Sequence, residues 1–169
     1  MQLLLIRHAI AQDRDEFARG GRPDAERPLT DLGRRRMSAA TKGLRQLVST
    51  IDLLATSPLV RTTETANIVA EAYALPDPTP VVALTPDATA AAFLSWLRAQ
   101  DADKTIAVVG HDPGLPHIVG LLLTGKAAPI IAMKKGAVCL LSVDGLPRTV
   151  TAVLRWSLAP AHLRDLGRL

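Results

Sequence analysis

A length of 169 residues favours a single domain spanning residues 1–169. The net charge is +4, but the basic residues are scattered among acids and only 3% of residues are aromatic, which argues against a nucleic-acid partner. No run approaches the ~18 apolar residues of a membrane span, and no basic start precedes a long apolar stretch, so we expect a cytoplasmic protein without a membrane partner.

The first predicted strand is the apolar run from Leu3 to Ile6, which is typical of a strand buried on both faces. Arg7 and His8 follow directly and should project from its carboxyl end, where open α/β sheets bind ligands. Arginine offers a planar fork of donors suited to phosphate, and histidine can attack or exchange a proton near neutral pH. Arg7 and His8 are therefore the first candidate site residues.

Residues 10–28 are polar, lack periodicity and predict a loop able to cover this pair. Thr30 should cap the following helix, and Gly33 near its start indicates close packing. The apolar stripe predicted for that helix consists of Met37, Ala40, Leu44 and Leu47.

A second strand is predicted at residues 52–55, with Ser57 as the cap of the next helix and Pro58 at its first position. Arg61 then lies in the first turn, where free backbone N–H groups and the helix dipole favour an anion. The predicted buried face of this helix consists of Ala66, Val69, Ala70 and Tyr73.

The middle of the chain predicts a proline-rich turn at 76–80, a brief edge strand at 81–83 and a third helix starting at Thr85 and Pro86. The inward residues expected of that helix are Ala90, Phe93, Leu94 and Leu97. A β-branched strand at 105–109 then leads through a polar turn into a fourth helix. His111 should leave the sheet at the same edge as His8 if the two strands are parallel.

Two further strands are predicted at 136–143 and 149–156, joined by a turn at 144–147 and followed by a tail to Leu169. Cys139 lies in the first of them and is expected to be a core thiol; as the single cysteine it excludes an internal disulfide. The alternation of strands and helices predicts an α/β fold with a largely parallel sheet.

Two apparent ligand motifs are set aside. Gly120, Gly125 and Lys126 match the spacing of a phosphate loop, but Ala127 replaces its Ser or Thr, and a helix ending in a glycine cap explains them. His111 and His117 do not share a helix face, and no carboxylate lies at zinc spacing. We therefore expect neither a metal nor another cofactor.

Arg7, His8, Arg61 and His111 are the strongest signal, because three separate segments bring them toward one edge of the sheet. A lone histidine is more often structural. Together, and with no obvious acidic partner, these four groups would repel one another unless an anion lay among them. The set therefore predicts a site for a phosphoryl group.

The motifs around these residues resemble those of the histidine phosphatase superfamily, also called phosphoglycerate mutase-like. Arg7-His8-Ala9 resembles its Arg-His-Gly signature, with Ala9 in place of the usual glycine. The segments at 57–66 and 109–114 resemble its Ser-Pro-x-x-Arg-x-x-x-Thr-Ala and second-histidine signatures. Residues 27–30 and 156–160 are similar to short SixA-type phosphohistidine phosphatases. The resemblance implies a three-layer α/β/α fold with a mostly parallel central sheet.

The resemblance also implies roles for these residues. His8 would be the nucleophile and form a phosphohistidine intermediate. The phosphoryl oxygens would be bound by Arg7, Arg61 and His111, with the pocket completed by Arg27. Ser57 would either contact the phosphate or cap its helix, and we favour the cap.

The substrate is expected to be a phosphohistidine on a protein, or else a small phosphorylated molecule, bound by a monomer. Between residues 73 and 100 only Asp77 and Asp87 are acidic, and Asp87 is either a general acid or a helix-start residue. A P–N bond needs less acid assistance than an alkyl ester, which favours phosphohistidine. The alternatives are a small-molecule phosphomonoesterase or mutase and a non-catalytic phospho-ligand module.

Overall fold

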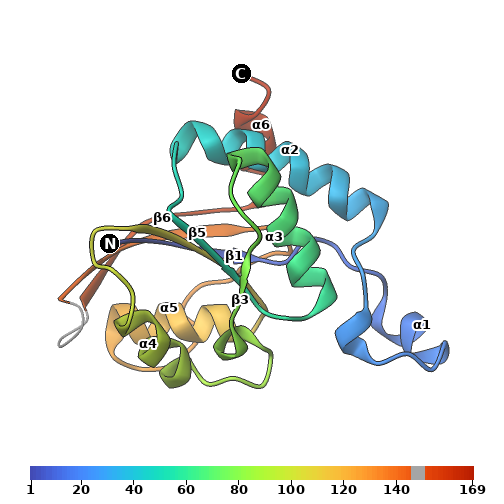
Figure 1. The fold of residues 1–169 in the computed structure, drawn as a ribbon, viewed down its shortest axis with the longest axis horizontal. Coiled ribbons are helices and arrows are strands. Elements are labelled where there is room, and N and C mark those ends of the chain that lie inside the picture. Colours follow the sequence, from blue (N-terminus) through green and yellow to red (C-terminus); the bar gives the residue numbers. More distant parts are fainter. Residues whose placement is uncertain (146–150) are drawn as a thin grey trace.

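The computed structural model describes residues 1–145 and 151–169, and within them a six-stranded sheet runs in the order β3-β2-β4-β1-β5-β6 (Figure 1). The strands are β1 (Gln2–Arg7), β2 (Leu53–Thr56), β3 (Thr79–Pro80), β4 (Thr105–Gly110), β5 (Val138–Asp144) and β6 (Thr151–Leu158). The pairs β1–β4, β4–β2 and β2–β3 are parallel, whereas β5 is antiparallel to both of its neighbours. The prediction of a mostly parallel sheet is confirmed.

Helices cover both faces of this sheet, as the three-layer prediction requires. The helices are α1 (Arg14–Arg19), α2 (Asp31–Leu47), α3 (Val60–Tyr73), α4 (Ala90–Arg98), α5 (Gly114–Thr124) and α6 (Pro160–Leu166), and there are 3-10 turns η1 (Asp24–Glu26) and η2 (Val82–Leu84). In Figure 1, α2, α3 and α6 lie on one side of the sheet and α4 and α5 on the other. Among the helices of the described ranges, none has the length and apolar character needed to cross a membrane.

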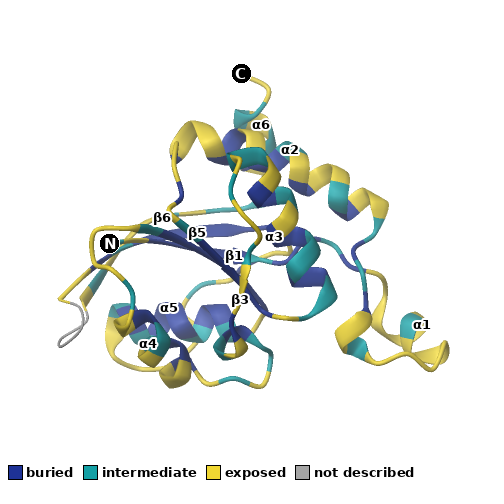
Figure 2. Ribbon diagram, in the orientation of Figure 1, coloured by how far each residue is buried: buried dark blue, intermediate teal, exposed yellow. Residues whose placement is uncertain are grey.

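Strand β1 is the centre of both apolar cores. Leu3 and Leu5 face the core under α4 and α5, while Leu4 and Ile6 face the core under α2, α3 and α6. All four are fully buried, and Figure 2 shows the central strands in the colour of buried residues. This arrangement confirms the strand predicted from the run of apolar residues and fixes the direction in which Arg7 and His8 leave the sheet.

The polar segment at 10–28 contains more structure than the loop predicted for it. Asp13 caps α1 by accepting hydrogen bonds from two backbone N–H groups, and η1 follows. A bridge between Ala11 and Leu29 closes the segment at its base. Thr30 caps α2 as predicted, and a Cβ at Gly33 would lie 2.1 Å from the Ile10 carbonyl oxygen, which confirms the close packing.

Several predicted boundaries were wrong. Helix α4 begins at Ala90 with Thr89 as its cap, because the Thr89 hydroxyl accepts the free N–H of Ala92, so Thr85 and Pro86 lie before it. The edge strand is β3, and residues 82–84 form η2. Leu47 is 41% exposed, since α2 ends there.

The expected tail instead forms α6 against α2. Gly43 permits this contact, because a Cβ there would lie 1.9 Å from the Leu163 carbonyl oxygen. Residues 146–150, which include the end of the predicted turn and the start of the predicted last strand, lie outside the described residues. Cys139 is buried in β5, and burial raises its pKa to about 12, as expected of a core thiol. Gly125 caps α5 in the left-handed conformation, in agreement with the rejection of a phosphate loop.

Candidate active site

Strands β1 and β4 end side by side and bring His8 and His111 together. Arg7 pairs with Gly110 in the parallel register, so the two histidines follow at equivalent positions. Their ring centroids are 5.3 Å apart. Both rings line a cavity of about 270 Å³, together with Arg7, Arg27 and Arg61. The structure thus brings together the four side chains that were expected to converge at one edge, Arg7, His8, Arg61 and His111, and Arg27 lines the same cavity.

The imidazole of His8 is oriented by the backbone that follows it. Its Nδ1 lies 2.8 Å from the Ala9 carbonyl oxygen. Because a carbonyl only accepts, Nδ1 carries the proton, and the lone pair of the neutral ring is on Nε2. Burial is the main cause that lowers the pKa of His8 to about 4; the Ala9 hydrogen bond opposes it, and the charges of Arg61 and Arg7 reinforce it. At neutral pH His8 is therefore an uncharged ring with a free nitrogen lone pair.

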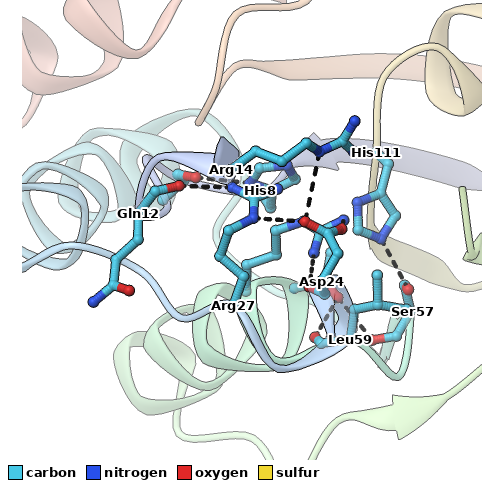
Figure 3. A network of polar contacts seen from close by, with 11 residues as sticks. His8, Gln12, Arg14, Asp24, Arg27, Ser57, Leu59 and His111 are labelled. Atoms are coloured by element: carbon cyan, nitrogen blue, oxygen red, sulfur yellow. Dashed lines mark hydrogen bonds and ion pairs between the residues drawn. The ribbon is translucent and has the colours of Figure 1, made fainter. Parts of the chain in front are cut away.

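The imidazole of His111 is oriented by a hydrogen bond with Ser57. The Ser57 hydroxyl lies 3.0 Å from Nε2 of His111, and Figure 3 shows this pair joined at the end of the network. Burial, followed by the charge of Arg61, lowers the pKa of His111 to about 3. Ser57 is fully buried and does not line the cavity.

Ser57 is also not the helix cap that the sequence predicted. The cap position of α3 is Leu59, and no side chain caps it. The Ser57 hydroxyl bonds to a histidine 54 residues away, and its carbonyl accepts from the Thr62 hydroxyl instead. The Ser57 side chain therefore orients His111.

Arg61 is the largest fully buried side chain of the described residues, and Asp24 holds it. Its two terminal nitrogens lie 2.9 Å from the Asp24 carbonyl oxygen and 3.1 Å from the Asp24 carboxylate. The same carboxylate accepts from Nε of Arg27 at 2.8 Å and lies 3.6 Å from Nε of Arg14 (Figure 3). The expectation that the cations lack an acidic partner was wrong.

The charges around Asp24 determine its ionisation. Partial burial raises its pKa, but the hydrogen bond from Arg27 and the positive charges of Arg61 and Arg27 outweigh this, so the pKa is below its usual range. Asp24 stays ionised and fixes the directions of two guanidinium groups. Sequence reasoning missed it; the one available signal is its position three residues before Arg27.

Arg7 has two partners of its own. It donates to the Met133 carbonyl and lies 3.3 Å from the Asp112 carboxylate. The Nε–H groups of Arg7 and Arg61 are buried and have no hydrogen-bond partner within the part of the chain that is described. Each guanidinium lines the cavity and has five N–H donors, more than its partners in the described residues use, so it keeps donor capacity for an anionic ligand.

The comparisons with known proteins agree with this geometry. The model of the histidine phosphatase superfamily (branch 1) matches residues 3–81. An uncharacterized protein of Picosynechococcus sp. strain PCC 7002 is 34% identical over 140 residues, covering 82% of each chain. The chain belongs to the histidine phosphatase superfamily. Members of this superfamily are phosphatases.

Two solved structures establish that this histidine phosphatase has the phosphoglycerate mutase-like fold. The protein histidine phosphatase SixA complexed with tungstate has a TM-score of 0.81 and 23% identity over 96% of this chain and 99% of that one. A mycobacterial glucosyl-3-phosphoglycerate phosphatase in complex with VO3 has a TM-score of 0.71 and 18% identity over 94% of this chain and 99% of that one.

In this phosphatase a buried hydroxyl joins the segment after His8 to the helix that carries Arg61. The Thr65 hydroxyl donates to the Arg61 carbonyl at 2.7 Å and accepts from the Ala9 N–H at 3.0 Å. Thr65 is fully buried. This link holds the His8 and Arg61 segments in a fixed relation, although they lie on different elements.

The carboxylates near the cavity are already engaged. Asp13 and Asp112 line it; Asp13 caps α1, where the N–H of Glu16 lowers its pKa, and Asp112 pairs with Arg7. Asp87 is exposed and does not line the cavity, whereas its neighbour Pro86 does. Asp87 is not a helix cap either, because α4 is capped by Thr89.

The two buried histidines predict a loss of stability in mild acid. Between about pH 6.5 and 4 the unfolded chain protonates both rings while the folded state keeps them neutral, so stability falls as pH falls. We expect about 2 kcal/mol for each histidine at about pH 5 relative to pH 7. Urea unfolding at the two pH values measures this.

A His8→Asn, His111→Asn double variant should lose most of this pH dependence, and His162→Asn, at an exposed position, is the control. A double variant whose stability still falls as steeply as that of the parent would contradict the assignment of the acid sensitivity to these rings.

Proposed function

We propose that this phosphatase hydrolyses phosphohistidine on a protein, with His8 as the nucleophile. The observation that carries the proposal is the 2.8 Å contact of His8 Nδ1 with the Ala9 carbonyl, because a proton on Nδ1 leaves the Nε2 lone pair free in a neutral ring. Around it, Arg7, Arg27 and Arg61 supply positive charge for a phosphoryl group. That SixA was solved with tungstate and the mycobacterial enzyme with VO3 supports oxyanion binding.

The reaction has two steps. In the first, Nε2 of His8 forms a bond to phosphorus, the P–N bond of the substrate breaks, and the substrate imidazole leaves with the electron pair and takes up a proton from water. In the second, water attacks the phosphohistidine, inorganic phosphate leaves and neutral His8 is restored. The arginines and His111 bind the three phosphoryl oxygens through both steps.

The leaving group decides between phosphohistidine and an alkyl phosphate. An alkoxide needs a proton from a general acid, and such help contributes about 10²–10⁴-fold. Of the carboxylates lining the cavity, Asp13 caps a helix and Asp112 is paired with Arg7. An imidazole leaves with less help, so this cavity is better suited to a P–N bond.

A small-molecule phosphomonoesterase is the second candidate, because Asp112 lies at the cavity and could protonate an alkoxide. The likeness to a glucosyl-3-phosphoglycerate phosphatase also supports it. A non-catalytic phospho-ligand module is less consistent with a neutral, oriented His8.

The test compares kcat/KM for a phosphohistidine peptide, a phosphoserine peptide of the same sequence and p-nitrophenyl phosphate. We expect the phosphohistidine peptide to exceed the phosphoserine peptide by about 10²-fold, the contribution of a general acid that the cavity does not supply. Asp87→Asn should leave hydrolysis of the phosphohistidine peptide unchanged.

Faster turnover of the phosphomonoesters, with an Asp112→Asn variant that abolishes it, would contradict the proposal and favour the second candidate. Binding of phosphohistidine without any hydrolysis would favour the non-catalytic module.

A further inference from the structure

A second hollow opens beside the His8 cavity. Its volume is about 430 Å³, and it shares Arg7 and Lys135 with the cavity around His8. Its walls are the start of α2, the start of α6 and the turn at 134–136. The two hollows are therefore neighbours, and Arg7 and Lys135 lie at both of them.

The second hollow is basic and free of acids. The cations that line it are Arg7, Arg36, Lys134, Lys135 and Arg164, and no Asp or Glu accompanies them in its described lining. Apart from Arg7, none of these side chains has a carboxylate within 4.0 Å in residues 1–145 and 151–169. The His8 cavity differs in this respect, because there the Asp24 carboxylate pairs with both Arg61 and Arg27.

Backbone hydrogen bonds hold the turn that carries Lys134 and Lys135 at a fixed place relative to His8. The N–H of Gly136 donates to the carbonyls of Arg7 and His8 at 3.1 and 3.0 Å, and the N–H of Ala137 donates to the Lys134 carbonyl at 2.8 Å. Gly136 has a φ of +82°, which favours glycine. Burial is the main cause of the lowered pKa of His8, and the charge of Lys135 adds to it. The turn therefore presents positive charge toward the reacting group.

The lining of the second hollow also contains apolar residues, which include Met37 and Pro160 beside Gly136. A Cβ at Gly136 would lie 3.5 Å from Pro160 and 3.8 Å from the Met37 sulfur. A lining of apolar residues and cations suits a chain segment whose backbone packs on the apolar residues while its acidic side chains reach the cations.

We propose that the second hollow binds an acidic segment flanking the phosphohistidine of the substrate protein. The proposal rests on the proposed function and names its substrate class, a phosphohistidine with Asp or Glu among its neighbours. The acidic side chains of this segment would bind the four cations that have no carboxylate partner in the described residues. These cations line the hollow next to the His8 cavity.

The test measures kcat/KM at low ionic strength for two phosphohistidine peptides that differ only in having Asp and Glu or Asn and Gln beside the histidine. Several exposed ion pairs together predict a preference of about tenfold for the acidic peptide, weakened by salt. Arg36→Glu and Arg164→Glu should each reduce this preference about threefold or more. Turnover of phosphoramidate, which is too small to reach the second hollow, should stay within about twofold.

Arg35→Glu is the matched control, because Arg35 is the exposed neighbour of Arg36 on α2 and does not line the second hollow. It should keep the full preference. Equal kcat/KM for the two peptides, or the same loss in Arg35→Glu as in Arg36→Glu, would overturn the proposal. A further outcome is that a small bisphosphate inhibits the turnover of both peptides and of phosphoramidate equally, and that Arg36→Glu removes this inhibition. That result would also overturn the proposal and assign the hollow to a metabolite.

Binding of the unphosphorylated peptides, followed by fluorescence anisotropy, separates this proposal from the proposed function. Acid-selective binding that Arg36→Glu weakens, without hydrolysis of any phosphohistidine, would support the second hollow and reject the catalytic proposal. Hydrolysis of phosphohistidine with no preference for the acidic peptide, in either kcat/KM or binding, would support the catalytic proposal and reject the second hollow as a site for an acidic segment.

Discussion

Replacing His8 with asparagine is expected to abolish the phosphoenzyme and to lower kcat/KM for a phosphohistidine peptide by on the order of 10⁴-fold or more. The asparagine amide can still donate to the Ala9 carbonyl, which His8 Nδ1 contacts at 2.8 Å, but it offers no nucleophilic nitrogen. His111 cannot take over, because its Nε2 is engaged with Ser57 and its ring centroid is 5.3 Å from that of His8.

The measurement is quenching of the enzyme in alkaline detergent after it has been mixed with a radiolabelled phosphohistidine peptide, followed by detection of label on the protein. The label should be acid-labile and stable to base in the parent and absent in His8→Asn. His111→Asn is the comparison; it should still form the phosphoenzyme, with kcat lowered by about 10²–10³-fold through the loss of one oxyanion contact. Label that persists in His8→Asn, or turnover above about 1% of the parent, would place the nucleophile elsewhere.

The sequence was sufficient for the parts of this site that depend on strand ends. A run of apolar residues at 3–6 requires a strand buried on both faces, and parallel pairing then places the residues after β1 and β4 at one edge. His8 and His111 could therefore be assigned to one cavity without knowledge of any side-chain contact. Arg61 followed from its place in the first turn of α3.

Contacts between distant segments could not be predicted in this way. The polar stretch at 10–28 contains several acids at similar spacing, and only the folded path, closed by the Ala11–Leu29 bridge, selects Asp24 as the partner of Arg61. Ser57 before Pro58 has the local pattern of a helix start, yet its hydroxyl bonds to a histidine from another strand. Such pairings depend on tertiary geometry, which overrides local propensity.

Replacing Arg61 with lysine is expected to lower kcat/KM by about 10²-fold or more, although the positive charge is kept. The guanidinium is 2% exposed, and its two terminal nitrogens already serve the carbonyl and the carboxylate of Asp24. Each terminal nitrogen carries a second N–H, and Arg61 lines the His8 cavity, so the guanidinium still has a donor for a phosphoryl oxygen. A lysine has one nitrogen for the carbonyl, the carboxylate and the phosphoryl oxygen. Burying an ammonium also costs more free energy of hydration than burying a guanidinium, because the ammonium is more strongly hydrated in water.

Arg34→Lys is a closely matched control for this variant. Arg34 also donates to a backbone carbonyl, that of Leu29 at 2.8 Å, and pairs with a carboxylate, that of Glu64 at 2.7 Å, but it does not line the cavity. Arg34→Lys should keep kcat/KM within about threefold and cost less stability than Arg61→Lys, because the Arg34 side chain is 40% exposed and that of Arg61 only 2%.

A second measurement compares the thermal unfolding of the parent, Arg61→Lys and Arg34→Lys with and without orthovanadate. A bound oxyanion supplies negative charge to a cluster in which Arg61, Arg27 and Arg14 share the single carboxylate of Asp24, so the parent and Arg34→Lys should gain stability with orthovanadate. Arg61→Lys should gain much less, because the group that would bind the oxyanion is gone. If the two variants instead lost kcat/KM equally and gained the same stability from orthovanadate, Arg61 would only hold the 10–28 segment against α3, and the phosphoryl group would be bound by Arg7 and Arg27 alone.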